Sequence, residues 1–204
     1  MHEVTIRQKI IDRVLERRGR HHLFDSLDPK LTALLVIDMQ NMFCEKGAPA
    51  EVIAARGICN NITRLCKEVR ALEGLVIWIT SATSFANGRS DWEMFLSNFI
   101  TQDVRNDRQE YLAPGGRGEK IWQDLEPEEG DLHIRKNRYS ALSSGASMPR
   151  STLSSHNIKN ILIAGTKTNI CCESTGRDAM QLDHQVVMVE DCCAALSDEE
   201  HRSA

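Results

Sequence analysis

The stretch 161–180, ILIAGTKTNICCESTGRDAM, constrains the fold more than any other part of this chain. It opens with a mostly apolar run, 161–165, of the kind found in strands of parallel sheets that are buried on both faces. A short polar turn, 166–169, follows, and then a helix begins with Cys171 in its first turn. A strand that passes directly into a helix indicates an α/β protein, and open α/β sheets hold their chemistry at such switches.

Cys171 is a candidate nucleophile because of this position. A cysteine in the first turn of a helix lies at the positive end of the helix dipole, which favours the thiolate, the nucleophilic form. The alternative is a buried structural thiol, since free cysteine is among the most buried residue types. The neighbouring Cys172 points to another side of the helix and is expected to pack in the core.

Four further segments are predicted to form strands: 34–37, 75–80, 131–136 and 186–190. Helical patterns lie between them, at 51–72 with Gly74 as the expected C-cap, at 119–125 and near 148–157. The resulting order, β-α-β-β-α-β-α-β, predicts an α/β fold. We expect a three-layer α/β/α sandwich around a mostly parallel, doubly wound, Rossmann-like sheet.

The remaining segments suggest appendages to this core. Residues 4–18 have the spacing of an amphipathic helix, so we expect an N-terminal helical arm, 1–28, beside a main domain, 29–204. Ser197 and Glu200 have the pattern of a capping box, but only four residues follow Glu200. We interpret this segment as a truncated C-terminal helix. The irregular stretch 81–130 is a long insertion of the kind that shapes a pocket or an interface.

Composition excludes several classes of function. A net charge of -4 gives no electrostatic footprint for nucleic acid or an anionic membrane. No apolar run is long enough to span a bilayer, and the charged N-terminus does not resemble a signal peptide. The 7 cysteines are odd in number and lack metal-site spacing, so we expect reduced thiols, a cytoplasmic protein and no bound metal.

Three motifs together resemble the isochorismatase-like cysteine hydrolases: LLVIDMQNMF at 34–43, HIRKNRYSAL at 133–142 and GTKTNICCESTGRDA at 165–179. The resemblance implies that Asp38, Lys136 and Cys171 form a catalytic triad. In physical terms the carboxylate would act as a base for the thiol, and the lysine would keep that carboxylate ionised. Taken singly, Asp38 could be a turn residue and Lys136 a solvated edge lysine, because such side chains are mostly exposed.

The resemblance also implies an oxyanion hole in the turn before the cysteine. Relatives have a cis peptide there, which matches Lys167–Thr168 in this sequence. Backbone N–H groups of Lys167 or Thr168 and of Cys171 would then stabilise a developing oxyanion. Many relatives carry alanine where Lys167 stands, and because the role is a backbone one, we expect the site to survive the change.

The segment KNRYSAL further resembles the signature of ureidoacrylate, biuret and N-carbamoyl amidohydrolases. It implies a cysteine-dependent amidohydrolase that cleaves a C–N bond of a small ureido or carbamoyl amide through a thioester. Arg138 would bind a substrate carboxylate and Tyr139 a ureido oxygen, unless they are a surface ion pair and a packed aromatic. No cofactor is expected, and the resemblance implies a homo-oligomer, a dimer or tetramer.

Other functions stay open at this point. A nicotinamidase would carry metal-binding histidines after the second strand, where this chain has none at 80–95. An isochorismatase would not depend on the cysteine, and a catalytically silent member would serve as a binding or scaffold protein. Trp78 is expected in the core, Trp92 and Arg89 are candidates for the pocket, and no histidine is assigned a catalytic role.

Overall fold

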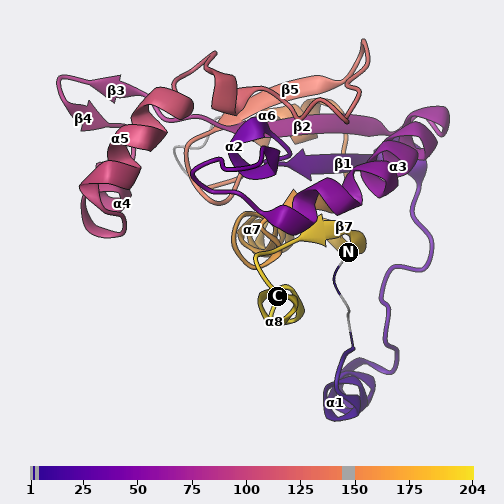
Figure 1. Ribbon diagram of the computed structural model, residues 1–204. Coiled ribbons are helices and arrows are strands. Elements are labelled where there is room, and N and C mark those ends of the chain that lie inside the picture. The colour runs from indigo at the N-terminus through magenta and orange to yellow at the C-terminus, as the bar shows by residue number, and fades with distance from the viewer. Residues whose placement is uncertain (1, 3–4, 144–149) are drawn as a thin grey trace.

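The computed structural model describes residues 2, 5–143 and 150–204. Its centre is a five-stranded sheet with the order β5-β2-β1-β6-β7, in which every neighbouring pair is parallel (Figure 1). The strands are β1 (Thr32–Ile37), β2 (Leu75–Ser81), β5 (Leu132–Lys136), β6 (Asn160–Thr166) and β7 (Gln185–Ala194). These are the predicted strands with their ends moved by a few residues.

The continuous apolar character of β1 is explained by burial on both of its faces. All its residues are buried, and successive side chains point to opposite sides of the sheet. Leu34 packs into the cluster on one face, whereas Leu35 packs into the cluster on the other. A strand with one solvated face would instead have alternated between apolar and polar residues.

Helices cover both faces of the sheet and complete three layers (Figure 1). One face carries α2 (Asn41–Cys44), the 3-10 helix η2 (Ile53–Ile58) and α3 (Cys59–Ala71). The other face carries α6 (Arg150–Ser155) and α7 (Glu173–Gln181). The predicted three-layer α/β/α sandwich is thereby confirmed, although the start of the helix expected near 148–157 lies outside the described residues.

Two local predictions were wrong. The left-handed residue after α3 is Glu73, with φ 63°, and not Gly74. Gly74 is needed for space instead, because a Cβ there would lie 2.8 Å from Cγ1 of Val69. The helix predicted at 119–125 is absent, since only the short 3-10 helix η3 (Arg117–Glu119) forms, and Ile121 then makes an extended bridge to Gln40.

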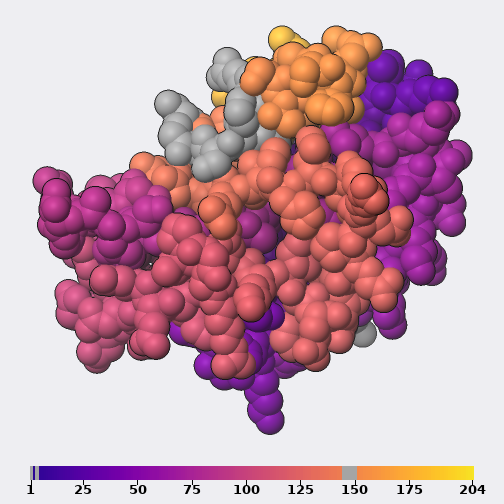
Figure 2. All heavy atoms as spheres, turned by 90° about the horizontal axis from the view of Figure 1, so that it is seen from above, coloured from indigo at the N-terminus to yellow at the C-terminus, as the bar shows by residue number. Residues whose placement is uncertain are grey.

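The insertion after β2 folds into a small lobe at one side of the sheet (Figures 1 and 2). It contains the antiparallel pair β3 (Phe85–Ala86) and β4 (Arg89–Ser90), followed by α4 (Glu93–Asn98) and α5 (Gln102–Tyr111). The Glu93 carboxylate accepts hydrogen bonds from Arg105 of α5, from Ser97 and from Ser90. These bonds join the two helices to the pair of short strands.

The N-terminal helix α1 (Gln8–Arg18) lies apart from the sheet, and none of its residues is buried (Figure 1). The short 3-10 helix η1 (Pro29–Leu31) leads from it into β1. At the other end, α8 (Asp198–Arg202) begins at Ser197, whose hydroxyl accepts from the backbone N–H of Glu200 as the capping box predicts. The division into an arm, 1–28, and a main domain, 29–204, stays a prediction. Among residues 5–143 and 150–204, no helix combines the length and apolar composition that crossing a bilayer requires.

Candidate active site

The site lies at the carboxyl edge of the sheet, where the chain changes direction. From β1 the chain continues outward to β2 and β5, whereas β6 and β7 extend the sheet on the other side of β1. The loops after β1 and β6 therefore separate at this edge, which is where open α/β sheets form their clefts. Asp38 follows β1, Lys136 ends β5, and Cys171 follows β6.

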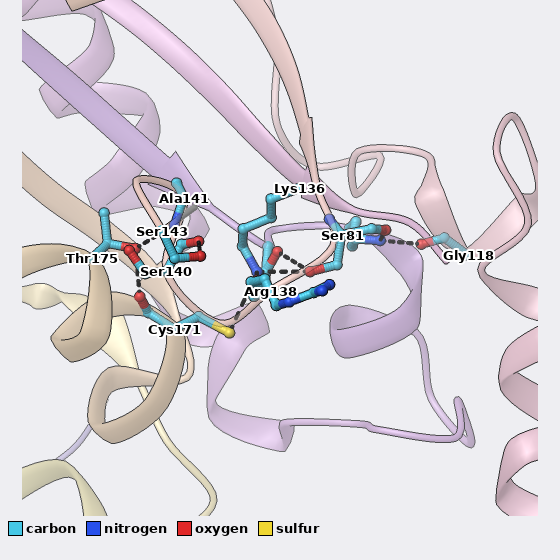
Figure 3. A network of polar contacts seen from close by, with 11 residues as sticks. Ser81, Gly118, Lys136, Arg138, Ser140, Ala141, Ser143, Cys171 and Thr175 are labelled. Carbon is cyan, nitrogen blue, oxygen red and sulfur yellow. Dashed lines mark hydrogen bonds and ion pairs between the residues drawn. The ribbon is translucent and has the colours of Figure 1, made fainter. Parts of the chain in front are cut away.

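The structure brings these three side chains together. The Lys136 ammonium donates to Oδ2 of Asp38 over 2.8 Å and lies 3.5 Å from Sγ of Cys171 (Figure 3). Asp38 and Lys136 are 0% and 1% exposed, so the ion pair is shielded from solvent, while Cys171 keeps 7%. Three residues far apart in the sequence thus converge at one point, as the motifs predicted.

Backbone conformation at the ends of β1 and β6 makes this convergence possible. Asp38 has φ 55°, a left-handed conformation that aspartate tolerates better than most residues. Its N–H donates to the carbonyl of Ile79 over 2.8 Å, which holds it beside β2. Gly165 of β6 has φ 116°, and a Cβ there would lie 2.0 Å from the carbonyl oxygen of Ile37. Only glycine therefore lets β6 approach the end of β1 so closely.

Ser81 joins the ion pair and was missed by sequence reasoning. Its hydroxyl donates to Oδ1 of Asp38 over 2.8 Å and accepts from Nζ of Lys136 over 2.7 Å. Gln40 fixes the backbone of Ser81, since its amide accepts from the N–H over 2.6 Å and donates to the carbonyl over 2.9 Å. The feature that could have identified Ser81 is its position, because it ends β2 in register with Lys136, which ends β5.

Cys171 lies in a π-helical turn, η4 (Thr168–Cys172), that continues directly into α7. Such turns occur frequently at functional sites. The hydroxyl of Thr175 donates to the carbonyl of Cys171 over 2.7 Å and accepts from the N–H of Ala141 over 3.1 Å (Figure 3). The turn is thereby tied to the segment after β5. Cys172 is 0% exposed and packs in the core, as expected.

The electrostatics differ from the expectation of a stabilised thiolate. Burial raises the pKa of Cys171 to about 12; the negative charge of Asp38 also raises it, while Lys136 acts in the opposite direction. The resting thiol is therefore neutral near pH 7, because desolvation outweighs the helix dipole. For Lys136, burial opposes the charge, but Asp38 and Cys171 raise its pKa above the ordinary value, so it stays protonated.

The turn before Cys171 requires one correction. The cis peptide lies between Thr166 and Lys167, one bond earlier than the predicted Lys167–Thr168. Thr168 is buried, and its hydroxyl lies 2.8 Å from Nδ1 of His201 in α8. The backbone N–H groups of Lys167, Thr168 and Cys171 stay the predicted donors of an oxyanion hole.

A cavity of about 260 Å³ opens onto Cys171 and Lys136. Arg138 and Tyr139 line it, with the Arg138 guanidinium 5.1 Å from the ring centroid of Trp92. Tyr139 packs edge-on against the same ring at 4.9 Å. Trp92 thus belongs to the pocket, whereas Arg89 does not line it. A larger hollow, about 720 Å³ and lined in part by Thr80 and His133, contains none of the three converging residues.

The insertion supplies a further wall of this cavity through side chains of α4, α5 and their neighbours, as its length suggested. They are Trp92, Phe95, Ile100, Val104 and Arg108. Sequence reasoning assigned no role to Arg108, nor to the side chain of Lys167, which also lines the cavity. Trp78 is buried as expected, and its indole N–H donates to Asp131. In the part of the chain that the structure describes, no three His, Cys, Asp or Glu side chains form a group able to hold a metal ion.

Comparison with known proteins identifies the family. The isochorismatase domain matches residues 32–204, and the chain belongs to that family. Among curated proteins, the ureidoacrylate amidohydrolase RutB of Variovorax paradoxus is 32% identical over 178 residues, covering 81% of this chain and 69% of that protein. The chain is therefore a hydrolase of the isochorismatase family.

Solved structures support the same fold. A cysteine hydrolase from Pseudomonas syringae superposes with a TM-score of 0.76 at 24% identity, covering 87% of this chain and 83% of that one. An isochorismatase family protein from Desulfovibrio vulgaris gives a TM-score of 0.70 at 29% identity, covering 85% of this chain and 86% of its own. These likenesses confirm the isochorismatase-like α/β architecture.

Proposed function

We propose that this protein is a cysteine-dependent amidohydrolase that cleaves a C–N bond of a small ureido or carbamoyl amide. The observation that carries the proposal is the ammonium of Lys136, which contacts both the Asp38 carboxylate and the Cys171 sulfur at the floor of a cavity. The name of the curated relative, a ureidoacrylate amidohydrolase, agrees with a carbamoyl substrate. Asp38, Lys136 and Cys171 then act as the catalytic triad.

In the first half of the reaction, Asp38 accepts the proton of the Cys171 thiol as the sulfur attacks the substrate carbonyl carbon. A carbon–sulfur bond forms, and the carbonyl oxygen becomes an oxyanion. The N–H groups of Lys167 or Thr168 and of Cys171 donate to that oxygen. Asp38 then returns its proton to the leaving nitrogen, the C–N bond breaks, and a thioester remains on Cys171.

In the second half, water attacks the thioester and gives its proton to Asp38. The carbon–sulfur bond breaks, the acid or carbamate leaves, and the proton returns to the sulfur. Lys136 keeps its charge throughout, so it holds Asp38 ionised between the two transfers. Arg138 and Tyr139, which pack against Trp92 of the insertion, contact the bound substrate from the wall of the cavity.

Incubation with ureidoacrylate, biuret and N-carbamoyl amino acids tests the proposal through release of ammonia. Replacement C171A should lower turnover by at least about 10³-fold, because the nucleophile is lost. The matched control is C66A, which removes a cysteine that is also buried but lies in α3, away from the cavity. Equal turnover by C171A and the native chain would contradict the thioester route.

The alternatives predict different results in the same assay. An isochorismatase-type hydrolase would retain full turnover of a vinyl ether in C171A, and a nicotinamidase would release ammonia from nicotinamide instead. A catalytically silent binding member would turn over none of these compounds while remaining folded. We favour the amidohydrolase because of the KNRYSAL segment and the ureidoacrylate relative.

We also propose that the protein works as a homo-oligomer in a reducing, cytoplasmic compartment. All seven cysteines are free and buried, which suits a compartment where thiols stay reduced. None of the residues of α1 is buried against the described part of the chain, so its apolar stripe suits contact with a second copy. No nucleic acid or membrane partner is proposed.

A further inference from the structure

The cavity described above carries more positive charge than the reaction needs. Four of its lining residues are cationic: Arg108, Lys136, Arg138 and Lys167. Among the described residues that line it, none is Asp or Glu. Asp38 compensates Lys136 directly, over 2.8 Å, but it leaves the other three charges without a counterpart in the cavity.

Arg108 is the clearest of these uncompensated charges. Its Nε atom is buried without a hydrogen-bond partner, and within 5–143 and 150–204 the guanidinium forms no ion pair. Its contact is with the face of Phe95, 5.6 Å from the ring centroid. Buried polar groups are almost always hydrogen-bonded, so a buried donor that lacks a protein acceptor indicates an acceptor supplied from elsewhere.

Lys167 shares this condition. It lines the same cavity of about 260 Å³ as Arg108. Burial lowers the pKa of Lys167, Cys171 and Glu200 raise it, and the positive charge of Arg108 lowers it. Over the described part of the chain, its ammonium has neither an ion pair nor a hydrogen-bond acceptor. An anion bound in this cavity would supply acceptors for both side chains and compensate their charges.

We infer that Arg108 and Lys167 bind an anionic group of the substrate, and that this group is a carboxylate. The inference rests on the proposed function and narrows it, because it selects ureido or carbamoyl acids over neutral amides such as biuret. It also moves the carboxylate away from Arg138, whose guanidinium stacks on Trp92 and donates to the carbonyl of Asn137. Lys167, for which only a backbone role was expected, then determines specificity through its side chain.

Calorimetry on the C171A protein tests this inference without turnover. The ligands are 3-ureidopropionate, which carries a carboxylate, and its primary amide, which is neutral but has nearly the same shape. We expect the acid to bind at least about tenfold more tightly than the amide. Replacement R108M or K167M should weaken binding of the acid by about tenfold or more and leave binding of the amide unchanged.

The control variant is R89M, which replaces an exposed residue of β4 in the same lobe that does not line the cavity. It should leave the preference for the acid intact, and R108K should retain most of it. Thermal unfolding separates binding from structure, since removal of an unpaired buried charge should leave the melting temperature of the unliganded protein unchanged or higher.

Equal binding of acid and amide, failure of both to bind, or equal weakening of both by R108M would overturn the inference. A preference for the acid that persists without any hydrolysis by the native protein would instead refute the proposed function alone. Equal hydrolysis of the acid and the amide would refute the anion site and leave the amidohydrolase proposal standing.

Discussion

At the scale of single residues, the chemistry depends on where one proton resides. The Cys171 thiol is neutral at rest because burial and the charge of Asp38 outweigh the ammonium of Lys136. The thiolate therefore forms only as its proton moves to Asp38, which keeps a strong nucleophile from reacting before substrate arrives. Of the two charges beside the sulfur, the Asp38 carboxylate disfavours the thiolate and the Lys136 ammonium favours it.

Because Asp38 raises the pKa of Cys171 and Lys136 lowers it, replacing each residue should shift that pKa in opposite directions. Replacement D38N should lower the pKa of Cys171, because a charge that raises it is removed, and K136M should raise it. Alkylation of Cys171 by iodoacetamide at pH 9, followed by mass spectrometry, should be faster in D38N by on the order of tenfold and slower in K136M. Shifts in the same direction for both variants would contradict the arrangement.

Position in the sequence indicated Cys171, which stands at a predicted helix start, whereas Asp38 and Lys136 were predicted because their motifs resemble those of the family. Ser81 carried no such signal, since serine is common where a strand ends. Arg108 lies in a mostly polar helix, α5, and only the packing of the insertion against the sheet buries it.

At the scale of elements, the Glu93 carboxylate links α4, α5 and β4 of the insertion. Hydrogen bonds from Arg105, Ser97 and the N–H of Ser90 lower the pKa of Glu93 to about 2, below its ordinary value of 4.5. A depressed pKa means that the stabilisation is complete above about pH 4.5 and is lost as pH falls toward 2.

We therefore expect α4 and α5 to loosen over this acid range before the central sheet does. Amide hydrogen exchange, corrected for intrinsic rates, should show loss of protection in 93–111 between about pH 4.5 and 2 while β1 and β6 stay protected. The variant R105M should show weakened protection in these helices already at neutral pH. Uniform loss of protection across the chain would contradict a separate response of the insertion.

Sequence pattern predicted the strands well and the irregular region poorly. Local runs of apolar residues predict buried strands, and the strands predicted in this way are present in the folded structure. The apolar residues of 119–125 have helical spacing, but tertiary contacts determine their structure, because the N–H of Trp122 donates to the carbonyl of Met39. Likewise, the peptide that is cis could be located only to within one bond.

At the scale of the whole molecule, helix α1 stands out because none of its residues is buried in the hydrophobic core. Its apolar residues Ile10, Ile11 and Val14 are only partly covered, and the helix lies apart from the sheet (Figure 1). An isolated helix of this length is marginal in water, so tertiary or intersubunit contact would have to stabilise it. We expect that contact in a dimer or tetramer of this chain.

The double replacement I11E/V14E should convert the assembly to monomers, since it places two charges on the apolar stripe of α1. Sedimentation velocity measures the change, and R17E, an exposed substitution on the same helix, is the matched control. A native chain that sediments as a monomer, or a double variant with the native mass, would refute the role of α1.

The cavity is assembled from two sources that are separate in the chain. The reacting groups stand on strand ends that the central fold fixes, whereas Trp92, Phe95 and Arg108 stand on a lobe outside it. Substitutions within that lobe can therefore change which substrate is preferred, while the groups that break the bond stay the same. A transplant of the lobe between relatives is consequently the natural route to redirecting this scaffold toward new compounds.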